Sequence, residues 1–290
     1  LVSFAGDLMI HQRRRLRNAL LYTLLAIVLV GLVFPVLFMA FTSFKSVGEV
    51  NRIPPTIIPR YPTLENYPFM ARAWDFWLTL RNTLILAGGS GLAATVLGAM
   101  AAYAFSRGTF RGRTLMYSLL VASMAVPAMV TLGPIFIAYL QFNLLDTHIG
   151  LILVFTAGGM PLATLLQFAY FNAIPRELDD AAAIDGAGRF MTLFRIIMPI
   201  AMPGVFVSFL LLFIGGWNEF LFVYTLSTSP DTQVLTTKLY TIPPRQADYQ
   251  SSNLDLVATA GMFVLLPLVP LLMLTQRQLV EGITFGAVQG

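Results

Sequence analysis

The sequence carries few side chains that could perform covalent chemistry. It contains no cysteine, and its two histidines, His11 and His148, lie far apart and form no H-E-x-x-H pair. Ser90 follows two glycines, but no histidine is placed to activate its hydroxyl, so close helix packing is the favoured interpretation. We therefore predict no catalytic residue, no metal site and no enzyme activity in this chain.

One polar cluster lies in apolar sequence, at Trp217, Asn218, Glu219 and Phe220. Fifteen residues separate Pro203 from Asn218, which corresponds to roughly 22 Å of helix rise and places the cluster in the outer half of a membrane span. Two interpretations stay open. The aromatic rings and the Asn and Glu side chains could line a path for a polar solute. Alternatively, they form an aromatic belt with an acid that reaches toward water.

The composition indicates that these residues lie in a membrane protein. Hydrophobic residues make up 57% of the 290 residues, charged residues make up 11%, and the mean hydropathy is +0.75. A soluble domain carries roughly 25% charged residues. The net charge is only +4, and we attribute it to arginines that lie beside a membrane. No nucleic-acid partner is therefore expected.

Six charge-free windows are long enough to cross a bilayer, which takes about 20 residues. They are too uniformly apolar for the alternating strands of a membrane barrel. We predict an all-α polytopic fold in one transmembrane domain, residues 1–290. Its spans are expected at about 19–44, 83–106, 114–141, 150–172, 203–227 and 256–275, with outer loops 45–82 and 228–255.

The arginines indicate the orientation of these spans. Eleven of the 18 Lys and Arg residues fall in the segments that are cytoplasmic if the N-terminus lies inside, and the short loop near residues 142–150 has none. Because short loops follow the positive-inside rule most strongly, we expect both termini in the cytoplasm. The first apolar window is much longer than the 7–15 residues of a signal peptide, so we expect an uncleaved span.

The inner segment 174–203 predicts a helix, a turn and a second helix. Acids near Pro175 suit the first turn of a helix, and Gly186 can adopt the positive φ of a tight turn. The second helix is expected to place Phe190, Phe194 and Ile197 on one face. About two to six residues suffice for a connection, so this longer segment suggests docking onto a partner, although a simple polar connection stays possible.

Four segments of the chain resemble one family. Residues 180–187, Asp-Ala-Ala-Ala-Ile-Asp-Gly-Ala, resemble the EAA loop of permease subunits of binding-protein-dependent ABC importers. Residues 103–112, 216–220 and 276–290 are similar to other segments of the smaller maltose-type carbohydrate permeases. The family usually has Glu where this chain has Asp180, so the contact made there is expected to be remodelled.

The resemblance implies a type I ABC importer transmembrane fold in a bacterial cytoplasmic (inner) membrane. It implies four partners besides lipid: a second homologous permease, two ATP-binding subunits and an extracytoplasmic substrate-binding protein. ATP and Mg would be bound by the ATPase subunits, so no cofactor is expected in this chain. The implied ATPase-coupling residues are Asp180, Ala181, Ala182, Asp185, Gly186, Ala187, Phe190, Phe194 and Pro199.

The outer loop 228–255 is expected to contact the binding protein. It joins two adjacent spans that a short turn could link, and it combines both signs of charge with tyrosines that are common at interfaces. The expected contact residues are Lys238, Tyr240, Arg245 and Tyr249. A solvated cap without a partner is the alternative.

A stand-alone secondary transporter or channel is the competing function. Ion-coupled carriers often hold acids or bases inside their spans, and here only Glu219 qualifies. The only lysines, Lys45 and Lys238, do not follow a glycine, so the chain lacks the lysine of a nucleotide-binding loop and an ATPase would be a separate chain. The spans also offer no cation to hold an anion, which favours a neutral sugar over an acidic or phosphorylated one.

Overall fold

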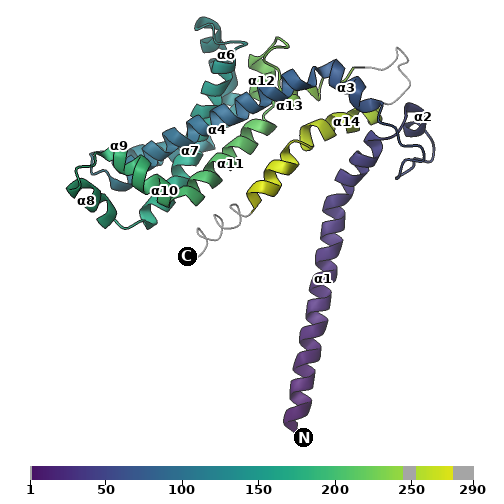
Figure 1. Ribbon diagram of the computed structural model, residues 1–290, viewed down its shortest axis with the longest axis horizontal. Helices are drawn as coiled ribbons and strands as arrows, with labels where there is room; N and C mark the ends of the chain where they lie inside the picture. Colours follow the sequence, from purple (N-terminus) through teal and green to yellow (C-terminus); the bar gives the residue numbers. More distant parts are fainter. Residues whose placement is uncertain (1, 244–252, 277–290) are drawn as a thin grey trace. The chain divides into compact units, whose positions relative to one another are not determined.

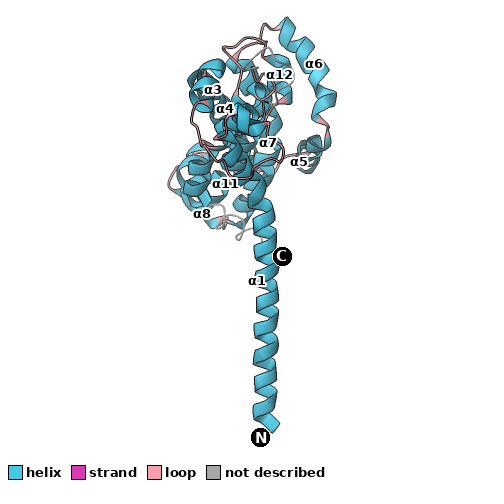
Figure 2. Cartoon of the chain, turned by 90° about the vertical axis from the view of Figure 1, so that its right-hand side faces the viewer, coloured by secondary structure: helices cyan, strands magenta, loops and turns pink. Residues whose placement is uncertain are grey.

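The computed structural model describes residues 2–243 and 253–276. These residues form helices and loops, and no strand occurs among them (Figure 2). The chain divides into two compact units, one made of Leu1–Met70 with Ile242–Phe263 and the other of Ala71–Thr241 with Val264–Gly290. The second unit holds the inner segment 174–203 and the polar cluster near Glu219.

The first unit contains a long apolar helix and a polar cap. Helix α1 spans Val2–Ser43, and its Arg17–Ser43 portion is long and apolar enough to cross a membrane. The short α2, Val47–Val50, follows it, and α3 covers Asn66–Trp74. The buried Asn66 donates from Nδ2 to the Ser43 carbonyl at 2.7 Å, which ties the start of α3 to the end of α1.

Three helices form the centre of the second unit: α4 (Phe76–Arg107), α7 (His148–Ala173) and α11 (Met202–Asn218) (Figure 1). Helices α4 and α7 approach closely because small residues face each other. A Cβ atom built on Gly98 would lie only 2.5 Å from Cβ of Ala163, so no larger residue fits there. This confirms that the small residues of α4 serve helix packing.

The third predicted span, 114–141, is broken in the structure. It consists of α5 (Arg113–Ala122), the 3₁₀ turn Ser123–Ala125 and α6 (Ala128–Gln141), and the two parts meet at 99°. Pro127 explains the break. Proline lacks an amide donor and disfavours helical geometry in the preceding residue, and Val126 is extended with ψ 119°.

The fifth predicted span, 203–227, also differs from a continuous helix. Helices α9 (Arg189–Thr192) and α10 (Met198–Ile200) flank the π-helical turn η2, Leu193–Ile197. The stretch Arg189–Ile200 then meets α11 at 87°. At its C-terminal end α11 stops at Asn218, because Glu219 is extended, and the chain resumes as α12 (Leu221–Leu226).

Three further helices are α8 (Glu177–Ile184), α13 (Leu235–Lys238) and α14 (Leu254–Leu265), and residues 268–276 continue as helix after a turn at 266–267. Within residues 2–243 and 253–276, four helices are long and apolar enough to cross a membrane, namely those at Arg17–Ser43, Phe76–Arg107, His148–Ala173 and Leu254–Gln276. The two bent pairs bring the number to six if each pair counts as one span.

Candidate transport path and coupling loop

The segment 174–203, which we call the coupling loop after its predicted role, folds as the predicted helix, turn and helix. Helix α8 ends at Ile184, and Gly186 takes φ +80°, a conformation that favours glycine. The amide of Ala187 donates to the Ala182 carbonyl at 2.8 Å, which closes the turn. The acids Glu177, Asp179 and Asp180 occupy the first turn of α8, as predicted.

The predicted coupling residues fall on two faces. Ala182 is buried, and Ala187 is half-buried. The others are exposed: Asp180, Ala181, Asp185, Gly186, Phe190, Phe194 and Pro199. Ile184 is also exposed, so the coupling loop presents acids and apolar side chains together on its free surface.

The prediction that Phe190, Phe194 and Ile197 share one helix face was wrong. Phe190 and Phe194 are 67% and 41% exposed, but Ile197 is 0% exposed and packs in the core. The π turn Leu193–Ile197 accounts for the difference. A π turn contains more residues than an α turn, so Ile197 rotates away from the face that the two phenylalanines share.

A polar clamp holds α8 to the C-terminal end of α4. The guanidinium of Arg107 donates from Nε to Oδ2 of Asp179 at 2.9 Å, and the Tyr103 hydroxyl donates to Oδ1 of the same carboxylate at 2.7 Å. Nη2 of Arg107 also donates to the Ile174 carbonyl at 2.9 Å. Among the residues that the structure describes, Arg107–Asp179 is the only ion pair.

Sequence reasoning missed this clamp because no motif singled out Asp179; the resemblance pointed to the neighbouring Asp180, in the different role of an ATPase-coupling residue. The two acids are neighbours, and only their angular position on α8 distinguishes them. Asp179 lies three residues before the buried Ala182, the spacing that places side chains on one helix face. Asp180 lies three residues before Ala183 in the same way, and the burial of Ala182 is known only from the structure, so the sequence alone does not separate the two acids.

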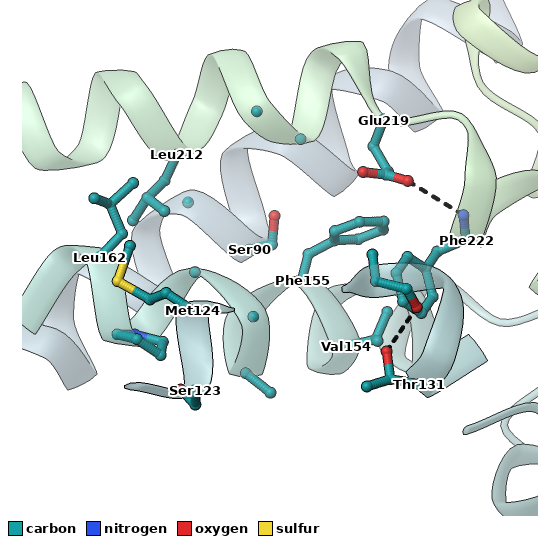
Figure 3. A pocket seen from close by; sticks show the side chains of 18 of the residues that line it. Ser90, Ser123, Met124, Thr131, Val154, Phe155, Leu162, Leu212, Glu219 and Phe222 are labelled. Atoms are coloured by element: carbon teal, nitrogen blue, oxygen red, sulfur yellow. Dashed lines mark hydrogen bonds between the residues drawn. The ribbon is translucent and has the colours of Figure 1, made fainter. Parts of the chain in front are cut away.

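A cavity of about 640 Å³ lies between α4, α7, α11 and the bent pair α5–α6 (Figure 3). Its polar groups are the Glu219 carboxylate and the hydroxyls of Ser90, Ser123 and Thr131. Phe155 and Phe222 contribute aromatic faces. One carboxylate oxygen of Glu219 accepts a hydrogen bond from the Phe222 amide at 3.2 Å, so this side chain also caps the start of α12.

Of the four predicted path residues, only Glu219 lines this cavity. Trp217 is 1% exposed, and its Nε1 donates to the Val264 carbonyl at 3.2 Å. Asn218 donates from its side chain to the Ile214 carbonyl of its own helix. Phe220 stacks on Tyr240 with ring centroids 4.1 Å apart. The break after Asn218 turns these neighbours in different directions.

The chain beyond α12 is bonded to the ends of other helices. We call residues 227–241 the outer segment, after the side of the membrane on which they are predicted to lie. Asp146, in the loop before α7, accepts hydrogen bonds from the amides of Thr228 and Ser229 and from the hydroxyl of Thr232. Thr236 donates from Oγ1 to the Glu219 carbonyl at 2.7 Å, which joins the outer segment to the rim of the cavity.

Two of the expected binding-protein contacts, Lys238 and Tyr240, lie in the outer segment, half-buried and exposed respectively. Arg245 and Tyr249 lie outside the described residues. Within the described part of the chain, no group of three or more His, Asp or Glu side chains could hold a metal ion.

Comparison with known proteins identifies the family. The model of the family "Binding-protein-dependent transport system inner membrane component" matches residues 94–284. This chain belongs to that family. The sulfoquinovosyl glycerol transport system permease protein SmoH of Agrobacterium fabrum is 32% identical over 268 residues, covering 91% of this chain and 92% of that protein. The diacetylchitobiose uptake system permease protein NgcG of Streptomyces coelicolor is 31% identical over 276 residues, covering 92% and 88%.

A solved structure shares the fold of this permease. A bacterial ABC transporter involved in the import of the acidic polysaccharide alginate matches with a TM-score of 0.77 and 21% identity, covering 91% of this chain and 96% of that chain. The predicted all-α, polytopic ABC importer fold is therefore confirmed, as is the resemblance to ABC importer permeases. A stand-alone transporter or channel is not favoured.

Proposed function

We propose that this permease forms, with a second homologous permease, the membrane path through which an ABC importer takes up a sugar or oligosaccharide. Relatives named for sugar uptake match nearly the whole chain, which supports a carbohydrate. The observation that carries the proposal is the coupling loop, which is anchored to α4 on one face and exposes acids and apolar side chains on the other.

The free surface of the coupling loop suits a separate ATPase subunit. Ile184, Phe190 and Phe194 are exposed. Helices α8 and α9, which carry the first two, lie at the end of the helical bundle opposite α12 and α13 (Figure 1). A short helix that presents apolar residues commonly docks into a groove of a partner. Two ATP-binding subunits, one for each permease, would bind ATP and Mg and drive the path between its inward-open and outward-open states.

The lining of the cavity supports a neutral sugar. The hydroxyls of Ser90, Ser123 and Thr131 donate to carbonyls of their own helices, so they offer only lone pairs to a ligand. Glu219 is likewise an acceptor, and no Lys or Arg lines the cavity. Sugar hydroxyls can donate to such groups, whereas a carboxylate or phosphate would meet no cation.

The outer segment would receive an extracytoplasmic binding protein, with Lys238 and Tyr240 among the contacts. The same proposal includes Arg245 and Tyr249, both termini in the cytoplasm, and residence in a bacterial inner membrane. The positive-inside distribution of arginines supports this orientation.

The turn of the coupling loop offers a test. Gly186→Pro is incompatible with φ +80° and removes the amide that donates to the Ala183 carbonyl at 3.1 Å. We expect this variant to insert and to pair with the second permease, but to lose co-purification of the ATPase subunits. Gly188→Ala is the matched control, because Gly188 has φ −73° and open space at its Cβ position. Normal co-purification and uptake with Gly186→Pro would show that the loop is only a connection.

A further inference from the structure

We infer that α4 relays movement between the coupling loop and the outer segment, and that Arg107 and Asn82 are the positioning residues that fasten these two elements to its opposite ends. This inference rests on the proposed function, because it assumes that an ATPase acts on the coupling loop. It adds a path within this chain by which events at the ATPase reach the outer surface.

The inner end of α4 is bonded to the coupling loop at several points. Arg107 and Tyr103 both hold the Asp179 carboxylate, as described above. Arg176, the residue before α8, donates from Nη2 to the Ser106 carbonyl at 3.1 Å. Because the side chains of Arg107 and Asp179 are only 11% and 17% exposed, their ion pair is little weakened by solvent. A displacement of α8 would therefore pull the inner end of α4 with it.

The outer end of α4 is bonded to the outer segment. Asn82 is 1% exposed, and its Nδ2 donates to the carbonyls of Asp231 at 2.7 Å and Gln233 at 3.1 Å. Oδ1 of Asn82 lies 3.0 Å from Nε2 of His148, which fixes the orientation of the amide. The next residue, Thr83, accepts a hydrogen bond from the Leu235 amide at 3.0 Å. A movement of this end of α4 would therefore move the outer segment with it.

Helix α4 is built to transmit movement along its length. It runs for 32 residues without a break. Of the four continuous helices that could cross a membrane in the described residues, it is the only one without a proline. Proline is the commonest cause of a sharp kink. The buried face of α4 packs against both α7 and α11, so bending of α4 would disturb two interfaces.

The middle of α4 also reaches the proposed path. Ser90 and Gly91 line the cavity (Figure 3 labels Ser90), and both lie between Asn82 and Arg107 along α4, nearer to Asn82. Movement of this helix would therefore change the cavity wall and the outer segment together. One rigid element would link nucleotide binding inside to the shape of the path and to the outer surface.

The inference is tested by labelling a single cysteine in the outer segment. The chain contains no cysteine, so Thr241→Cys supplies one at an exposed position. The full transporter is reconstituted in nanodiscs, and the rate of maleimide labelling is compared between the nucleotide-free state and the state trapped with Mg-ATP and vanadate. No substrate needs to be known. We expect a rate difference of about fivefold or more, the size of a typical coupling between sites.

Two substitutions should each reduce this difference. Arg107→Gln removes the ion pair with Asp179, and Asn82→Ala removes both bonds to the outer segment. Matched controls are Arg111→Gln and Arg81→Ala, since both arginines are exposed and no bond of their side chains occurs in the described residues. Both controls should keep the difference. If Asn82→Ala does not assemble, Thr83→Val removes the bond from Leu235 with a side chain of nearly the same size.

The double variant separates a relay from two local effects. Asn82 and Arg107 are 25 residues apart on one helix, roughly 37 Å of rise, so they share no direct contact. Changes at such a distance normally add. If α4 is the relay, Asn82→Ala with Arg107→Gln should lose no more of the labelling difference than either change alone.

The outcomes distinguish this inference from the proposed function. If the otherwise unsubstituted Thr241→Cys transporter shows no nucleotide-dependent labelling, or brings no ATPase with it, the proposed function fails and the relay fails with it. If that transporter responds but Arg107→Gln and Asn82→Ala respond as their controls do, only the relay is overturned.

Discussion

The hydroxyl of Thr232 lies 2.6 Å from Oδ1 of Asp146, although 86 residues separate the two in sequence. Asp146 has φ +61° and sits in the short loop between α6 and α7. Its carboxylate also accepts from the amides of Thr228 and Ser229. One side chain therefore holds the start of the outer segment to the outer end of α7.

The first prediction is that Asp146→Asn lowers the stability of the purified protein by about 1 kcal/mol or more, because an amide cannot accept at both positions as the carboxylate does. Thermal unfolding in detergent measures this change. Asp231→Asn is the control, since the Asp231 side chain is exposed and only its carbonyl is bonded. Equal unfolding temperatures for the two variants would contradict the prediction.

The same carboxylate predicts a pH dependence. Burial by itself raises the pKa of Asp146, but the hydrogen bonds from Thr232, Ser229 and Thr228 outweigh burial and lower the pKa below its ordinary value of 3.8. Its contribution is therefore fully present above pH 3.8 and is lost as the pH falls through the lowered pKa. The difference between the native protein and Asp146→Asn should stay constant from pH 8 to about pH 5 and shrink only in stronger acid.

The second prediction concerns the contact between α4 and α7. Gly98→Val should destabilise the protein by about 1–3 kcal/mol or prevent assembly, because its Cβ would lie 2.5 Å from that of Ala163 and both backbones would have to move. Gly88→Val is the control in the same helix, since a Cβ atom there meets nothing within 4 Å. The measurement is the yield and melting temperature of each variant. Similar values for the two would show that the helices separate without cost.

The third prediction is the topology. Single cysteines at Thr109 and Ala187 should react with a membrane-impermeant maleimide only from the cytoplasmic side, and a cysteine at Thr56 only from outside. The natural chain contains no cysteine, so each label reports one position. Labelling of Ala187→Cys from outside would reverse the orientation on which the proposed function depends.

The fourth prediction separates two roles of Glu219. Glu219→Gln keeps an acceptor for the Phe222 amide, so its stability should stay within about 0.5 kcal/mol of the native protein, whereas Glu219→Ala should lose about 1 kcal/mol with the helix cap. If the carboxylate also holds a neutral sugar in the cavity, Glu219→Gln should slow uptake despite normal stability. Normal uptake by Glu219→Gln would limit this residue to the cap. Melting temperature and uptake into vesicles give the two readings.

Much of the coupling loop could be predicted because its signals are local. Acids at the start of α8 and a glycine at the turn are properties of neighbouring residues, and Gly186 does take a positive φ. The orientation of Ile197 could not be predicted in this way. It depends on a π turn, which neighbouring residues do not specify. In the structure this turn occurs where Ile197 packs in one core cluster with Phe171 and Ala201.

The sequence by itself determined that the chain is an all-α membrane protein, and it predicted the helix, turn and helix of the segment 174–203, because apolar length, charge placement and short motifs act over one helix or less. Only the tertiary structure decided that Asp179 rather than Asp180 pairs with Arg107, and that Glu219 rather than Trp217 faces the cavity. Neighbouring residues on a helix point about 100° apart. Their roles therefore depend on which face meets another helix, and that is decided by contacts between residues distant in sequence.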